Sequence, residues 1–166
     1  MNKILNYIKI NELISTSGQP KIEELELIAN EGFEVVINLA MPTTSNALEN
    51  EDKIVSSLNM SYIHIPVDFE NPKLSDLKLF LNILQALGAN KVWIHCAKNF
   101  RVSCLMYLYR QYYMGVDLPT AQEEMHKVWE PNETWTGLIH AVALQLQGRK
   151  STQELQQALM KVDHFG

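Results

Sequence analysis

The sequence predicts an α/β fold with a mainly parallel central sheet, flanking helices and a helical C-terminal tail. Over the first 100 residues, short apolar runs alternate with amphipathic helical segments. This alternation is typical of right-handed β–α–β units. After residue 100 only helical patterns follow, and we expect them to cover one face of the sheet. A chain of 166 residues can bury a substantial core, so residues 1–166 are expected to form a single domain.

The strands are predicted in the first 96 residues. Residues 6–20 contain short extended patterns that end in a Gly-Gln-Pro turn. Apolar runs predict strands at 33–40, 60–67 and 90–96. In a parallel sheet, ligands bind beyond the carboxyl ends of the strands. Cys96, the last residue of the third run, is therefore expected at that edge.

Helical spacing and capping residues predict the remaining elements. Apolar periodicity predicts helices at 21–32, 47–59, 76–88 and 101–115, with Ser75 as the N-cap of the third. Thr120 and Glu123 form a capping box before a helix at 121–129. Asn132 can cap a helix at 133–148, and a second capping box, Ser151 with Glu154, predicts a separate helix at 152–162. Trp129 and Trp135 are expected to pack this tail onto the core.

Composition excludes several classes of function. The net charge of -5 argues against nucleic acid as the main partner, because nucleic-acid binding requires a basic face. No apolar stretch reaches membrane-spanning length, and the N-terminal residues have no signal-like apolar core. Two cysteines cannot form a disulfide framework, so a reducing cytoplasm is the expected compartment. The histidines are too scattered for a metal site, so no metal is predicted.

Residues 94–103, Ile-His-Cys-Ala-Lys-Asn-Phe-Arg-Val-Ser, indicate an anion site. A turn between a strand and a helix presents unpaired N–H groups, which bind anions and stabilise a cysteine thiolate. Arg101 adds a charged fork that matches oxyanion geometry. His95 can orient the turn through a backbone hydrogen bond, and Ser103 can donate to the sulfur. The alternative is that Cys96 is a buried structural cysteine.

The segment resembles the signature loop, His-Cys-x5-Arg-Ser/Thr, of the cysteine-dependent protein tyrosine and dual-specificity phosphatases. Ser-Gly-Gln-Pro at 17–20, Val-Val-Ile-Asn-Leu-Ala at 35–40 and Tyr-Ile-His-Ile-Pro-Val-Asp-Phe-Glu-Asn-Pro at 62–72 extend the likeness to a bacterial family of small dual-specificity-like phosphatases. The resemblance covers roughly residues 17–103. It implies a cysteine-phosphatase fold and hydrolysis of a phosphomonoester through a phosphocysteine, without a cofactor.

The resemblance also implies roles for individual residues. Cys96 matches the nucleophile, and Arg101 is the candidate for the arginine that holds the phosphoryl oxygens. Asp68 matches the loop acid that protonates the leaving group, with Glu70 as an alternative. Ser103 matches the hydroxyl residue that eases departure of the sulfur. The remaining loop residues are expected to surround the substrate: His95, Ala97, Lys98, Asn99, Phe100 and Val102.

The loop departs from the family pattern in two ways. Four residues, not five, separate Cys96 from Arg101, and Val102 stands where the arginine is expected. One helical position rotates a side chain by about 100° around the axis, which weakens bidentate contact. Asn99 replaces the usual glycine, although asparagine tolerates a left-handed conformation.

Because of this spacing, two alternatives remain open. One is a catalytically weak or inactive phosphate-binding module. The other is a rhodanese-like sulfurtransferase, whose active loop resembles Cys-x4-Arg. In all three cases the expected ligand is a phosphorylated substrate or another small oxyanion, and the sequence leaves any protein partner open. Cys104 is either a core residue or a partner that traps oxidised Cys96 as a disulfide.

Overall fold

The computed structural model describes residues 1–165, which are built around a five-stranded sheet with the strand order β1-β2-β5-β3-β4. The strands are β1 (Ile8–Lys9), β2 (Ile14–Ser17), β3 (Val35–Asn38), β4 (Ser61–His64) and β5 (Val92–His95). Only the short β1 runs antiparallel to its neighbour. The mainly parallel sheet expected from the sequence is therefore confirmed.

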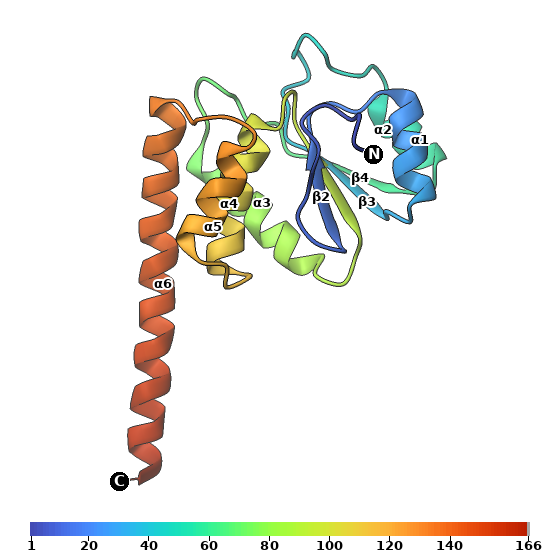
Figure 1. Ribbon diagram of the computed structural model, residues 1–166. Helices are drawn as coiled ribbons and strands as arrows, with labels where there is room; N and C mark the ends of the chain where they lie inside the picture. The colour runs from blue at the N-terminus through green and yellow to red at the C-terminus, as the bar shows by residue number, and fades with distance from the viewer. Residues whose placement is uncertain (166) are drawn as a thin grey trace.

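Helices cover both faces of the sheet (Figure 1). On one face lie α1 (Ile22–Asn30) and α2 (Glu51–Ser57); on the other lie α3 (Leu74–Ala86), α4 (Phe100–Tyr112), α5 (Leu118–His126) and the start of α6 (Glu133–Phe165). Alternate residues of a strand pack against the helices on opposite faces of the sheet. Val36 packs with residues of α1 and α2, and Ile37 packs with residues of the other helices. Eight of the 13 residues of α4 are buried, which confirms a central buried helix.

The C-terminal tail differs from the expectation of two helices. Residues 133–165 form one continuous helix, and its far end extends beyond the rest of the molecule (Figure 1). Gly148 and Ser151 stay helical because no proline interrupts them, and the Thr152 hydroxyl donates to the Gly148 carbonyl, 2.9 Å away. Within residues 1–165, no helix is both long and apolar enough to cross a membrane.

Some helix boundaries also differ from the sequence prediction. Helix α3 begins at Leu74, so Ser75 is not its cap. Helix α5 begins at Leu118, three residues before the predicted start at 121. Its cap is Asp117, whose carboxylate accepts the Thr120 N–H. Asn132 does cap α6 as predicted, because its side chain accepts the Trp135 N–H at 3.0 Å.

The register of the sheet brings the candidate site together. His95, the last residue of β5, is paired with Ser17 of β2 on one side and Asn38 of β3 on the other. The parallel strands therefore end at one edge, and the residues that follow them meet there. Gly18 and Cys96 belong to this edge.

Candidate active site

Cys96 lies at the floor of a short loop between the central strand and the central helix. It follows β5 directly and is fully buried, with 0% of its surface exposed. Helix α4 begins four residues later at Phe100. The first N–H to bond within this helix is that of Ser103, which donates to the Asn99 carbonyl at 2.9 Å. The N–H groups before it belong to the first turn, where a helix leaves its donors unpaired.

The loop carbonyls are held by neighbouring segments. Ala97 O accepts the Gln19 N–H at 3.0 Å and the Asn46 side-chain amide at 2.9 Å. Lys98 O accepts the side-chain amide of Asn6 at 2.9 Å. In a trans peptide the next N–H points opposite to the carbonyl, so the N–H groups of Lys98 and Asn99 face away from these partners. Such a row of amides is an anion-binding arrangement.

The Ser-Gly-Gln-Pro segment needs a glycine at position 18 because the cysteine loop lies very close to it. A Cβ on Gly18 would lie 2.8 Å from the Ala97 carbonyl oxygen and equally close to the Leu5 side chain. Ser17 holds the same segment from behind, because its hydroxyl accepts the Trp93 indole N–H at 2.9 Å. The segment therefore packs directly against the cysteine loop.

Asn99 adopts the left-handed conformation that asparagine tolerates. Its φ is 68°, and it precedes α4 as the N-cap residue. Its side-chain amide donates to the Asn6 carbonyl at 2.8 Å and to the Thr16 hydroxyl at 3.1 Å. These bonds fix the turn at the position where glycine is the usual residue.

Arg101 is almost completely buried, with 5% of its surface exposed. Its Nη1 donates to the Val67 carbonyl at 2.9 Å, and its guanidinium lies 5.7 Å from the ring centroid of Phe69. Its Nε has no hydrogen-bond partner among residues 1–165. A buried guanidinium with a free N–H is suited to an oxyanion.

A pocket with a volume of ≈ 400 Å³ opens beside this loop. It brings together five of the predicted site residues: Asp68, Ala97, Lys98, Phe100 and Arg101. One other segment contributes Met41, Thr43 and Thr44 to the lining, and Phe69 adds to it beside Asp68. Cys96, His95, Asn99 and Val102 do not line the pocket, and each of these residues is 0% exposed.

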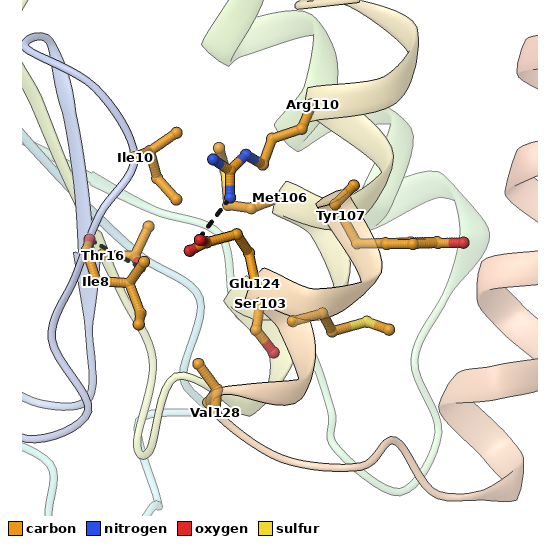
Figure 2. Close-up of a pocket in the computed structure, with 11 residues that line it drawn as sticks. Ile8, Ile10, Thr16, Ser103, Met106, Tyr107, Arg110, Glu124 and Val128 are labelled. Carbon is orange, nitrogen blue, oxygen red and sulfur yellow. Dashed lines mark hydrogen bonds and ion pairs between the residues drawn. The ribbon is translucent and has the colours of Figure 1, made fainter. Parts of the chain in front are cut away.

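Ser103 lies at a different cavity. Figure 2 shows its side chain beside a small space that also contains the ion pair of Arg110 and Glu124, whose charged atoms are 3.5 Å apart. The Ser103 hydroxyl donates to the Phe100 carbonyl at 2.8 Å and accepts the Trp129 indole N–H at 3.0 Å. Donation to the Cys96 sulfur would therefore require the hydroxyl to rotate, and that role stays a prediction.

Asp68 lies in the loop between β4 and α3. Its Oδ1 accepts the N–H groups of Glu70 at 2.9 Å and Asn71 at 3.2 Å. The loop is anchored from the tail, because the Trp135 indole donates to the Phe69 carbonyl at 2.9 Å. Trp135, which is expected from its sequence position to pack the tail on the core, therefore also holds this loop.

Two aromatic residues, Phe69 and Phe100, line the pocket, and Trp129 packs against both of them. Phe100 and Trp129 stack with ring centroids 4.5 Å apart, and Phe69 lies 5.7 Å from Trp129. Aromatic side chains bury large areas and pack in such offset geometries. Sequence reasoning missed the role of Phe69, although its place directly after Asp68 offered a signal.

Glu51 is a second residue that sequence reasoning missed. Its side chain is 4% exposed and lies 2.8 Å from the His95 ring. Burial alone raises the pKa of Glu51, but hydrogen bonding and charge from His95, followed by Gln19 and Tyr62, lower it on balance. In the sequence, Glu51 belongs to an acidic run at 49–52, a pattern typical of solvated surface.

The two cysteines are free thiols in different surroundings. Cys104 lies inside α4, and burial raises its pKa to about 12 despite contacts with Trp129 and Ser103 that lower it. A thiol in such a place is a weak nucleophile near neutral pH.

In the part of the chain that the structure describes, no group of three or more His, Cys, Asp or Glu side chains has the arrangement to hold a metal ion.

Comparison with known families places this loop among the cysteine phosphatases. Residues 9–157 match the family described as DSP-PTPase phosphatase fused to NAD+ kinase. The chain belongs to this family. A search of curated proteins finds no match.

Solved structures agree with membership of this phosphatase family. A DUF442 protein of Shewanella putrefaciens CN-32 is 26% identical, with a TM-score of 0.79 over 87% of this chain and 95% of the other. Two more distant structures share the fold. TpbA of P. aeruginosa, in complex with pTyr, has a TM-score of 0.62 at 17% identity over 84% of this chain and 91% of its own. The catalytic core of SIW14, a PP-IP phosphatase of S. cerevisiae in complex with citrate, has a TM-score of 0.68 at 15% identity over 82% and 85%.

Proposed function

We propose that the protein hydrolyses a phosphomonoester through a phosphocysteine on Cys96. The observation that carries this proposal is the cysteine loop itself: its carbonyls are bonded to neighbouring segments, and its amides and the free Nε of Arg101 are left for an oxyanion. The phosphatase family and its structural relatives support the same chemistry.

The proposed reaction has two steps. The Cys96 thiolate attacks phosphorus in line, and the bond between phosphorus and the ester oxygen breaks. Asp68 gives its proton to the departing oxygen, while amides and Arg101 stabilise charge on the three equatorial oxygens. Water, deprotonated by Asp68, then breaks the sulfur–phosphorus bond and releases inorganic phosphate and the thiolate.

The substrate must reach a cysteine below the pocket surface. An aryl phosphate fits this requirement because its ring can lie against Phe69 and Phe100, which line the pocket. The pTyr and citrate held by related structures are both oxyanions, which supports an oxyanion as the ligand here.

Hydrolysis of p-nitrophenyl phosphate between pH 5 and 8 tests the proposal. We expect metal-independent turnover that vanadate inhibits and that Cys96→Ser abolishes. Acid quenching followed by mass spectrometry should find a phosphate on the Cys96 peptide. Equal rates for the wild type and Cys96→Ser would reject the enzyme.

A phosphate-binding module without turnover is the second candidate. One observation favours it: Asp68 Oδ1 already accepts two N–H groups of its own loop, so this oxygen is not directed at a leaving group. Calorimetry with inorganic phosphate then gives binding in the absence of hydrolysis. Binding that Arg101→Ala leaves unchanged would reject this candidate as well.

Sulfur transfer remains an alternative of the Cys-x4-Arg spacing, although the family match favours phosphate chemistry. Treatment with thiosulfate followed by mass spectrometry of the Cys96 peptide tests it. A persulfide on Cys96, with thiocyanate formed from cyanide, would support transfer of sulfur in place of phosphate.

A further inference from the structure

A buried pair of titratable residues lies outside the pocket, next to the cysteine. His95 is 0% exposed and Glu51 is 4% exposed. His95 is the last residue of β5 and immediately precedes Cys96. Glu51 is the first residue of α2, 44 positions before His95. Two buried ionisable groups in contact need a reason, because desolvation of charge is costly.

Both nitrogens of the His95 ring face acceptors. Nε2 lies 2.8 Å from Glu51 Oε2, and Nδ1 lies 3.1 Å from the Cys96 carbonyl oxygen. A carbonyl and an ionised carboxylate only accept hydrogen bonds, and a neutral imidazole has only one N–H. Both contacts are hydrogen bonds only when the ring carries two protons.

The surroundings of the pair favour an ionised Glu51. Its other oxygen, Oε1, accepts from the Gln19 side-chain amide, and its pKa is lowered despite burial. The flanking strands place Ser17 and Asn38 beside His95, and neither of these residues titrates. The other titratable groups nearby are Cys96, next in sequence, and Tyr62 beside Glu51, with Asp52 adjacent on α2.

We propose that Glu51 is a positioning residue that keeps His95 as an imidazolium directly behind Cys96. The ion pair is neutral overall, but its positive end faces the cysteine loop and stabilises a thiolate there. This inference rests on the proposed function, in which the Cys96 thiolate is the nucleophile.

Glu51 also connects three parts of the site mechanically. It bonds to His95 of β5 and to Gln19, whose backbone N–H donates to the Ala97 carbonyl. The carboxylate thereby ties the start of α2 to both segments that define the rear of the loop. A structural role and an electrostatic role must therefore be separated by measurement.

Ring nitrogen shifts of ¹⁵N-labelled protein at pH 7, read after backbone assignment, test the protonation state directly. The wild type should show two protonated nitrogens at His95. Glu51→Gln should show one, because a glutamine amide can donate to a neutral Nε2 while Nδ1–H still reaches Cys96 O. A singly protonated ring in the wild type would overturn the inference even if the variant did not fold.

The pH dependence of Cys96 alkylation tests the consequence. Iodoacetamide is uncharged, and peptide mapping separates Cys96 from Cys104. We expect the midpoint of the Cys96 rate to rise by about one pH unit in Glu51→Gln, which corresponds to about a tenfold slower reaction below the midpoint. The matched control is Asp52→Asn, at the exposed neighbouring carboxylate, which should leave the midpoint unchanged.

The same midpoint in wild type and Glu51→Gln would overturn the electrostatic role. A purely structural change alters the rate without shifting the midpoint, so only a shift supports this role. Neither measurement uses a phosphate ester. Absence of phosphatase turnover would therefore reject the proposed function, whereas these two results accept or reject the role of Glu51 separately.

Discussion

The rear and the front of the cysteine loop are built differently. At the rear, Gly18, Gln19 and Asn46 contact the loop backbone, and the Glu51–His95 pair lies buried beside it. At the front, the pocket exposes Lys98, and the Nε of Arg101 has no partner in residues 1–165. Donors that are already oriented need no reorganisation when charge develops. The rear supplies that order, and the front keeps its donors free for a ligand.

The same contrast explains how a loop with four intervening residues is accommodated. Asn99 takes the left-handed conformation at the rear, so α4 begins at Phe100 and Arg101 stands in its first turn. The long side chain of Arg101 then reaches the Val67 carbonyl beside Asp68. The arginine therefore lies between the cysteine loop and the acid loop. Substitutions on each side test this division.

The largest effect after loss of Cys96 is expected for Arg101→Ala at the front. Removal of a preorganised donor of this kind lowers kcat/KM by about 10³-fold. Arg101→Lys keeps the charge but loses the planar fork, so it should recover only a small part of the kcat/KM that Arg101→Ala loses. Steady-state kinetics, with thermal unfolding as a check on folding, measure this. Full activity in Arg101→Lys would contradict a role for the fork.

Asp68→Asn should have the next largest effect. Asparagine can still accept the Glu70 N–H, but it cannot give a proton to the leaving group, so turnover should fall by about 10²-fold. The loss should be greater for phenyl phosphate than for p-nitrophenyl phosphate, whose leaving group needs less protonation. Glu70→Gln is the matched control and should remain active. A loss of turnover in Glu70→Gln but not in Asp68→Asn would assign the role of general acid to Glu70.

Gly18→Ala tests the rear by steric contact alone. The added methyl group meets the Ala97 carbonyl at 2.8 Å, so the loop must move. Such overpacking costs about 1–3 kcal/mol of the free energy of unfolding, and we expect a fall in kcat/KM of about tenfold. Gly137→Ala in α6, where a Cβ meets nothing within 4 Å, is the control and should be neutral or stabilising. Denaturant unfolding and kinetics measure both.

The smallest effect is expected at Asn99. Asn99→Gly keeps the left-handed turn but loses the two side-chain bonds, a change of about 1 kcal/mol in stability. Asn99→Ala loses the same bonds and must also adopt a φ of 68°, which adds about 1 kcal/mol. Denaturant unfolding of the pair separates the two costs. Equal stability of both variants would show that the turn relaxes when the side chain is removed.

Patterns that are local along the chain could be predicted from the sequence. Alternating apolar runs and amphipathic segments determine the sheet and the central helix α4, because burial of one face follows from residue spacing. The turn at Asn99 and the place of Cys96 at the sheet edge follow from the strand and helix on either side of the loop. The break predicted in α6 was wrong because a glycine and a serine lower helix propensity without ending a helix.

Only the tertiary structure decided which distant groups support the loop. Glu51 contacts His95 from 44 residues away, Arg101 bonds to Val67 across 34, and Trp135 reaches Phe69 across 66. No residue spacing encodes these contacts, because they depend on how the layers pack around the sheet. The sequence determined where Cys96 stands in the chain, and three-dimensional packing determined the hydrogen-bond partners of its loop and the charges around it.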